Sequence, residues 1–151
     1  MPEKPLKPTE RATQVPLGAD ATLGFIGHVE TPWKTRADCP KQGRLDGPDC
    51  AVVLRSPWDG ALQGIERFEM LELYLWFHLA RRDLLVIDPS HGGGPRGVFA
   101  LRSPVRPNPV ALSTVRLLAV QGARLIVRGL EAVDGTPLLD IKPGRCPHTP
   151  G

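Results

Sequence analysis

The chain has 151 residues, of which 41% are hydrophobic, and its 19 Lys and Arg residues against 16 Asp and Glu residues give a net charge of +3. This composition is typical of one soluble globular domain, and no apolar run approaches the about 20 residues that a membrane-spanning helix needs. The mild basic excess permits a nucleic-acid partner without requiring one.

The two ends of the chain indicate where the folded part begins and ends, and the cysteines indicate its redox setting. Residues 1–20 are rich in proline and lack an apolar core, which argues against a secretory signal and predicts a flexible tail. Cys39, Cys50 and Cys146 form no CxxC pair, which argues against a disulfide scaffold or a four-cysteine zinc site. We therefore expect a tail at 1–20, one folded domain at 21–145, a short C-terminal tail at 146–151, no metal site, no membrane segment and a reducing, cytoplasmic setting.

Most expected elements are short strands separated by turn signals. Residues 71–77 alternate most clearly, with leucines on one face and Glu72, Tyr74 and Trp76 on the other, whereas residues 58–68 have the apolar spacing of one or two helical turns. The other expected strands are residues 22–29, 51–54, 84–87, 98–101, 110–112, 113–120, 123–127 and 136–143. Eight or nine strands without a βαβ rhythm predict a mainly β fold, a small single-domain β-barrel with one or two short helices.

Two loops have unusual composition. Residues 34–49 form a long polar loop, and loops of that length in compact domains are often functional. Residues 88–96 contain three consecutive glycines, but no GK[ST] sequence follows them and no helix is expected to start before Gly97. We therefore expect a flexible loop there, and neither a phosphate cradle nor a Rossmann fingerprint.

The segment 97–114 concentrates polar groups between two apolar runs. Its middle part, residues 102–109, holds two arginines, a serine and an asparagine among three prolines, which restrict the backbone and lower the cost of presenting side chains to a ligand. A plain proline-rich connection between strands would have the same composition. Similarly, the polar face ending at His78 indicates either a cavity lining or an amphipathic strand in which His78 is merely hydrogen-bonded.

Together these blocks resemble the TsaA-like (TrmO-type) family of methyltransferases, from about Leu23 to Pro143. The residues that carry the resemblance are IGHV at 26–29, TPW at 31–33, CPKQG at 39–43, Gly64-Ile65, WFH at 76–78, GVFA at 97–100, RSP at 102–104, RPNP at 106–109, and DGTP at 134–137 with DIKP at 140–143. The resemblance implies a β-barrel that binds S-adenosylmethionine without a Rossmann fold and acts as a homodimer. It also implies methylation of N6 of threonylcarbamoyladenosine in the anticodon loop of tRNA, with no DNA partner.

The resemblance implies the cofactor contacts, and the chemistry of methyl transfer to a carbamoylated nitrogen suggests the other roles. The proton acceptor would be His78 or Asp140, while Arg102 or Arg106 would stabilise charge on the carbamoyl oxygen. Arg106 and Asn108 would otherwise hold the substrate's carboxylate or a phosphate, with Lys142 also at the substrate. Cofactor contacts would fall on Gln42, Gly43, Phe77, His78, Arg102, Leu112, Leu130, Glu131 and Asp134. Contacts with tRNA would come from Arg36, Lys41, Arg44, Arg81, Arg82 and Arg96, with Trp33 as a stacking surface.

The chain departs from many relatives at Leu101, Val105, Ala111 and Gly144, and the tRNA enzymes of the family often continue into a smaller C-terminal domain. Two alternatives therefore stay open: a barrel that methylates a small molecule with the same cofactor, and one that binds the cofactor or a small RNA ligand without turnover.

Overall fold

The computed structural model describes residues 4–144, and within this range the chain forms nine strands and three short 3-10 helices. Its contacts divide the chain into two units. The smaller unit combines Met1–Thr22 with Phe77–Val110, and the barrel unit combines Leu23–Trp76 with Ala111–Gly151. Within the described range, no helix has the length and apolar character needed to cross a bilayer.

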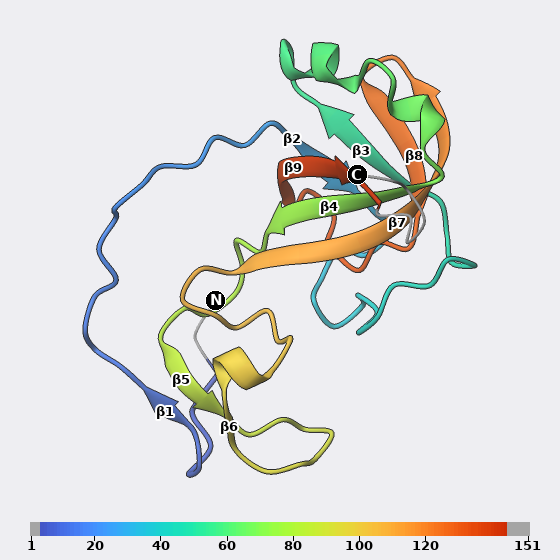
Figure 1. Ribbon diagram of the computed structural model, residues 1–151. Helices are drawn as coiled ribbons and strands as arrows, with labels where there is room; N and C mark the ends of the chain where they lie inside the picture. The colour runs from blue at the N-terminus through green and yellow to red at the C-terminus, as the bar shows by residue number, and fades with distance from the viewer. Residues whose placement is uncertain (1–3, 145–151) are drawn as a thin grey trace, which may run out of the picture. The chain divides into compact units, whose positions relative to one another are not determined.

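Six strands close the barrel in the order β2-β3-β8-β7-β4-β9, as Figure 1 shows. Closure pairs both edges of the sheet and so leaves no strand with a free row of backbone groups. The prediction of a mainly β, closed barrel is confirmed. The strands are β2 (Gly27–Glu30), β3 (Cys50–Leu54), β4 (Met70–Trp76), β7 (Val110–Gln121), β8 (Arg124–Arg128) and β9 (Pro137–Pro143).

The barrel core follows from the alternation of β4. Leu71, Leu73 and Leu75 have exposed fractions of 0%, because successive side chains of a strand point to opposite faces and this face is turned inward. Burying each leucine contributes about 1.5–3 kcal/mol. Valines and leucines of the other strands complete the core, among them Val29, Val52, Val115, Leu125, Val127 and Leu138.

The turns also follow local sequence. Residues 58–68 form two 3-10 helices, η1 (Trp58–Leu62) and η2 (Ile65–Arg67), where one or two helical turns were expected. Gly122 joins β7 to β8 at φ +64°, a left-handed conformation that glycine adopts without steric cost. Strands β7 and β8 therefore pair as an antiparallel hairpin.

The smaller unit contains a three-stranded sheet in the order β1-β5-β6, formed by β1 (Arg11–Ala12), β5 (Leu84–Ile87) and β6 (Arg96–Gly97). Strand β1 lies inside the segment that was expected to be a flexible tail. It is held in place because it pairs with β5, and because Lys7 and Thr9 donate hydrogen bonds to the carbonyl and carboxylate of Asp88 at 2.5 and 2.8 Å. The C-terminal tail 146–151 and Cys146 lie outside the described residues.

A second expected strand, residues 98–101, is instead the 3-10 helix η3 (Val98–Ala100). Val98 is buried with an exposed fraction of 3%, but Phe99 is 80% exposed. The carbonyl of Val98 accepts hydrogen bonds from the Leu101 amide and the Arg106 guanidinium, so a turn and a side chain satisfy this backbone where a neighbouring strand was expected. The apolar run was therefore a wrong indicator of a strand.

Gly27 marks a place where β2 and β3 approach too closely for a side chain. A Cβ atom there would lie 2.1 Å from the Val53 carbonyl oxygen. We expect Gly27→Ala to destabilise the protein by about 1–3 kcal/mol, because two backbone segments would have to separate. Gly24→Ala is the matched control, since its Cβ would meet no atom within 4 Å. Urea unfolding midpoints measure both, and an equal midpoint for the two variants would contradict the expectation.

Candidate functional site

The long polar loop after β2 is anchored where it begins by Asp134, which lies between β8 and β9. The Asp134 carboxylate accepts hydrogen bonds from the Thr31 amide at 3.0 Å and from the Lys34 ammonium at 2.6 Å. The Thr31 hydroxyl is buried and donates to the Ala132 carbonyl at 2.8 Å. These bonds join two segments that are about a hundred residues apart in the sequence and fix where the loop leaves the barrel.

The same loop is fastened a second time at Gly43. Its N–H donates to the Glu131 carboxylate at 2.8 Å, and a Cβ atom on Gly43 would lie 1.8 Å from the Gly129 carbonyl oxygen. Gly129 itself has φ +108°, and a Cβ there would lie 3.0 Å from the Thr114 carbonyl oxygen. Because Gly43 and Gly129 have no side chains, the backbones of the long loop, of the Gly129 segment and of β7 can approach closely. Gln42, next to Gly43, is exposed.

The anchoring by Asp134 depends on its charge. The Lys34 ammonium, and after it the Thr31 amide, hold the pKa of Asp134 below its usual value. A depressed carboxyl pKa stabilises the fold above the unfolded-state value, and this stability is lost as pH falls through the folded-state pKa. We expect wild type to be more stable than Asp134→Asn at neutral pH, and the difference to shrink between about pH 5 and about pH 2. Thermal unfolding across this range measures it; a constant difference would show that charge is not the cause.

Two thiols lie in or beside the same loop. Burial, and then the charge of Glu131, raise the pKa of Cys39, while burial raises the pKa of Cys50 to about 11. Both cysteines are therefore protonated at neutral pH and poor nucleophiles. Within residues 4–144, no group of three or more His, Cys, Asp and Glu side chains is arranged to hold a metal ion.

In the smaller unit, side chains tie the proline-rich segment together. Arg106 Nη1 donates to the carbonyls of Val98 and Leu101 at 3.1 and 2.6 Å, and Arg82 donates to the Pro107 carbonyl and the Asn108 side-chain oxygen at 2.6 and 3.2 Å. The two arginines thus hold both ends of the segment. This favours the interpretation as a pre-organised loop over a plain connection.

Phe77, His78 and Arg102 also belong to the smaller unit. The Phe77 N–H donates to the Pro109 carbonyl at 2.9 Å, and its side chain is half-buried. The side chains of His78 and Arg102 are exposed. Both side chains are therefore accessible to a ligand without any rearrangement of the core.

Asp140 and Lys142 lie on the outside of β9, next to Tyr74 of β4. Their charged groups are 3.5 Å apart and their side chains are 54% and 58% exposed, so the pair contributes little to stability. The Lys142 ammonium lies 5.8 Å from the centroid of the Tyr74 ring. Both groups are accessible to a substrate.

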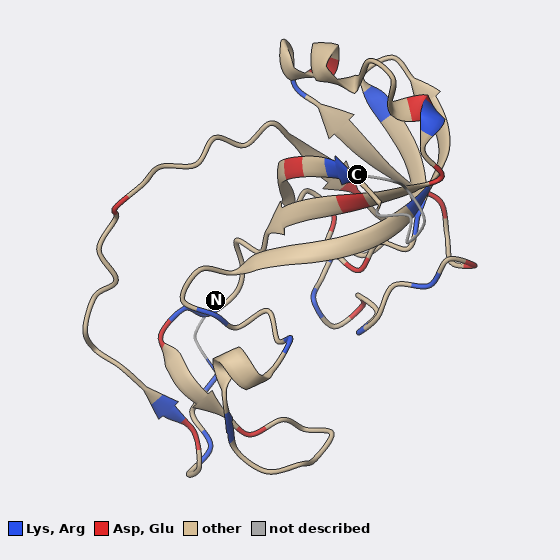
Figure 2. Cartoon of the chain, viewed as in Figure 1, with Lys and Arg blue, Asp and Glu red and all other residues tan. Residues whose placement is uncertain are grey.

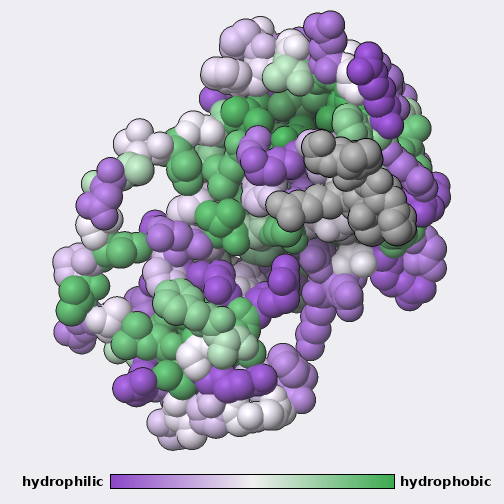
Figure 3. Space-filling model, in the orientation of Figure 1, coloured by the Kyte–Doolittle hydropathy of each residue, from purple (hydrophilic) through white to green (hydrophobic). Residues whose placement is uncertain are grey.

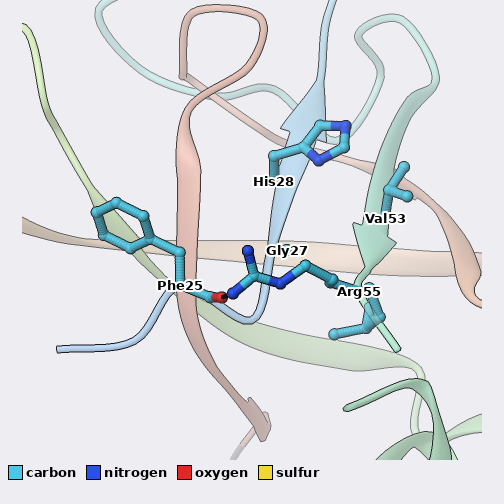
Figure 4. A pocket seen from close by; sticks show the side chains of 6 residues that line it. Phe25, Gly27, His28, Val53 and Arg55 are labelled. Atoms are coloured by element: carbon cyan, nitrogen blue, oxygen red, sulfur yellow. Dashed lines mark hydrogen bonds between the residues drawn. The ribbon is translucent and has the colours of Figure 1, made fainter. Parts of the chain in front are cut away.

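Two open hollows on the barrel unit share His28. The smaller, about 260 Å³, is lined by Phe25, Gly27, His28, Val53, Leu54 and Arg55. Figure 4 shows the Arg55 guanidinium directed at the Phe25 carbonyl, with which it forms a hydrogen bond of 2.6 Å. The larger, about 860 Å³, includes Glu30, Arg124 and the predicted cofactor residue Asp134. The sequence reasoning gave His28, Glu30 and Arg124 no role, although the alternation of β2 would have put the first two on one outer face.

With this geometry in hand, the chain can be compared with known proteins. A family model described as the tRNA-methyltransferase O N-terminal domain matches residues 28–145. The chain belongs to this family. The match covers all six barrel strands except the first residue of β2, together with the long loop and its anchoring segment.

Proteins similar to this chain differ in length. A "Probable S-adenosyl-L-methionine-binding protein VirR" of Rhizobium radiobacter is 45% identical over 96% of this chain and 83% of its own length. A "Putative S-adenosylmethionine-dependent methyltransferase RcsF" of Pseudomonas aeruginosa is 38% identical over 81% of this chain and 54% of its own. The crystal structure of TrmO from Pseudomonas aeruginosa superimposes with a TM-score of 0.68 at 31% identity, over 84% of this chain and 57% of that one. The chain thus spans little more than half of the TrmO structure.

The predicted cofactor residues of this family member divide between the two units. Gln42, Gly43, Leu112, Leu130, Glu131 and Asp134 lie in the barrel unit, and Phe77, His78 and Arg102 lie in the smaller unit. Within the barrel unit, the hydrogen bond from Gly43 to Glu131 brings the two predicted segments together. Leu130 is only 1% exposed, so it lies beneath the surface of the barrel unit.

Proposed function

We propose that this chain is an S-adenosylmethionine-dependent methyltransferase that methylates N6 of threonylcarbamoyladenosine in the tRNA anticodon loop. The observation that carries the proposal is the family match over residues 28–145, together with relatives that are named for binding S-adenosylmethionine or for methyl transfer from it. In line with the resemblance, we propose tRNA as the partner, a homodimer as the working form, and the cytoplasm as the location.

The loop around Gly43 suits a role in holding the cofactor. It is fixed by Glu131 from one side and by contact with Gly129 from the other, so little conformational freedom is lost when a ligand binds. Glu131 already accepts the Gly43 N–H, which supports a role in positioning the loop. The proposed cofactor contacts are Gln42, Gly43, Phe77, His78, Arg102, Leu112, Leu130, Glu131 and Asp134.

S-adenosylmethionine supplies a methyl carbon that is electrophilic because it is bonded to a positive sulfur. The protein needs to align the accepting nitrogen and to remove its proton, and we propose His78 or Asp140 as the base. Since Arg106 Nη1 is engaged with two carbonyls, we assign Arg106 to orienting the substrate together with Asn108 and Lys142, and Arg102 to charge stabilisation.

The experiment is methyl transfer from labelled S-adenosylmethionine to total tRNA from cells that lack this activity, followed by mass spectrometry of the nucleosides. A new methylated threonylcarbamoyladenosine is the expected product. If the protein binds the cofactor but leaves tRNA unlabelled, the acceptor assignment is wrong.

A second function has specific support. VirR, of which the chain covers 83%, is named only as a probable binding protein, and the TrmO structure extends well beyond the part matched here. The same barrel would then methylate a small molecule, or bind the cofactor without turnover. Label transferred to a small-molecule fraction of a cell extract would identify the first case, and cofactor binding without transfer to any fraction the second.

A further inference from the structure

Phe99 is exposed to an unusual degree for its size. Its side chain is 80% exposed, compared with 42% for Phe68 and 48% for Trp58. Leaving a phenylalanine in water forgoes about 1.5–3 kcal/mol of burial energy. The ring stands on η3, whose first residue Val98 is buried, so the backbone beneath it is anchored while the ring faces outward. Apolar side chains reach the surface over η3 in Figure 3.

One arginine lies beside this ring, and a second is hydrogen-bonded to the segment that follows it. The guanidinium carbon of Arg106 lies 5.8 Å from the centroid of the Phe99 ring, and its Nη1 donates to the carbonyls at both ends of η3. The next two residues, Pro107 and Asn108, accept hydrogen bonds from Arg82. We call the side chains of Phe99, Arg106 and Arg82 the η3 surface.

The excess of basic over acidic residues lies in the smaller unit; Figure 2 colours Lys and Arg blue and Asp and Glu red. Among its described residues, eight Lys and Arg stand against four Asp and Glu, whereas the described barrel unit has ten against eleven. The net positive charge of the chain therefore belongs to the unit that carries the η3 surface. The basic residues of the smaller unit are Lys4, Lys7, Arg11, Arg81, Arg82, Arg96, Arg102 and Arg106, and the acidic ones are Glu10, Asp20, Asp83 and Asp88.

An exposed aromatic ring beside a guanidinium group, on a unit with a basic excess, matches the chemistry of an unpaired nucleotide. A base stacks on the ring, and the phosphates on either side meet the positive charge. We propose that the η3 surface binds single-stranded RNA, with one unpaired base stacked on Phe99. This RNA-binding proposal rests on the proposed function, because that function makes RNA the partner. The stacking residue expected from the sequence, Trp33, is half-buried, and Arg44, expected at the RNA, is paired with Asp46.

The test is binding of the full chain to a fluorescently labelled oligoadenylate of about ten nucleotides, a length typical of single-strand sites. We expect Phe99→Ala to weaken binding between about 5-fold and about 150-fold, the range for the loss of one stacked base. Phe99→Tyr should keep the wild-type affinity, because it keeps the ring. Phe68→Ala, which removes an exposed ring from the barrel unit, is the matched control and should bind as wild type does.

The salt dependence separates stacking from charge. For single strands, affinity falls as salt rises, and the slope of log affinity against log salt becomes shallower by about 0.7 for each lost phosphate contact. Arg82→Gln should therefore make this slope shallower. Phe99→Ala should lower affinity at every salt concentration and leave the slope unchanged.

Several results would overturn the proposal: no RNA binding by wild type, wild-type affinity in Phe99→Ala, or full affinity in Phe99→Leu, which keeps apolar area without a π face. If Phe99→Ala changes the molar mass measured by light scattering, the ring covers an interface between copies of the chain instead. The oligonucleotide contains no threonylcarbamoyl group. Methyl transfer can therefore fail while oligoadenylate binding persists, and that result would contradict the proposed function only. Methyl transfer without oligoadenylate binding would contradict only the proposed role of the η3 surface.

Discussion

Replacing Arg102 with alanine should abolish S-adenosylmethionine binding and leave the fold intact. We propose this guanidinium as a cofactor contact. Charge-assisted hydrogen bonds contribute about 1.5–3 kcal/mol each, so the loss of two such bonds should reduce affinity at least about 100-fold. The Arg102 side chain is exposed and lies outside the barrel core. Its removal should therefore change the free energy of unfolding by no more than about 0.5 kcal/mol.

Isothermal titration with the cofactor and thermal unfolding of the same samples measure the two effects separately. Arg67→Ala removes another exposed arginine, at the end of η2, and should bind the cofactor as wild type does. Arg102→Lys keeps the positive charge but loses the planar fork, so it should be intermediate. Wild-type affinity in Arg102→Ala would remove this residue from the cofactor site.

Gly43→Ala should produce the second large effect, a combined loss of stability and cofactor affinity. The added Cβ would lie 1.8 Å from the oxygen and 2.6 Å from the carbon of the Gly129 carbonyl. Both are main-chain atoms, so no side-chain rotation relieves the overlap, and the loop must move away from Glu131. We expect a destabilisation of about 1–3 kcal/mol, with loss of the Gly43 to Glu131 hydrogen bond.

Gly60→Ala is the control for this variant, because a Cβ on Gly60 would meet no atom within 4 Å. A further variant, Glu131→Gln, keeps an acceptor for the Gly43 N–H but removes its charge. It should weaken cofactor binding less than Gly43→Ala does. Full cofactor affinity in Gly43→Ala would mean that the position of the loop does not matter for the site.

The sequence predicted those parts of the fold that have a local signal. The leucines of β4 repeat every second residue, so both their strand and their buried face could be read directly. Strand β1 could not be found this way, because two residues carry no periodicity and its partner β5 lies about seventy residues away in sequence. Residues 98–101 are an apolar run, which predicted a strand. Their backbone is instead fixed by a turn and by hydrogen bonds from the Arg106 side chain, and a local apolar pattern indicates neither of these.

The sequence suggested candidate site residues one by one but not their arrangement. Family resemblance identified Gly43 and Glu131, yet their hydrogen bond joins positions 88 residues apart in sequence. Likewise, no pattern indicated that Gly43 would meet Gly129. Phe99 was missed as a surface residue because a phenylalanine in an apolar run is usually buried.

The separation of the smaller sheet from the barrel has a consequence for how the protein opens. All the strand pairs of the barrel lie outside residues 77–109, and the smaller sheet consists of strands of two, four and two residues. Few ladder hydrogen bonds protect the smaller sheet, so its amides should exchange with deuterium well before those of β4 and β7. The smaller unit would then unfold and refold many times during the lifetime of one folded barrel, and an RNA held there would slow that cycle.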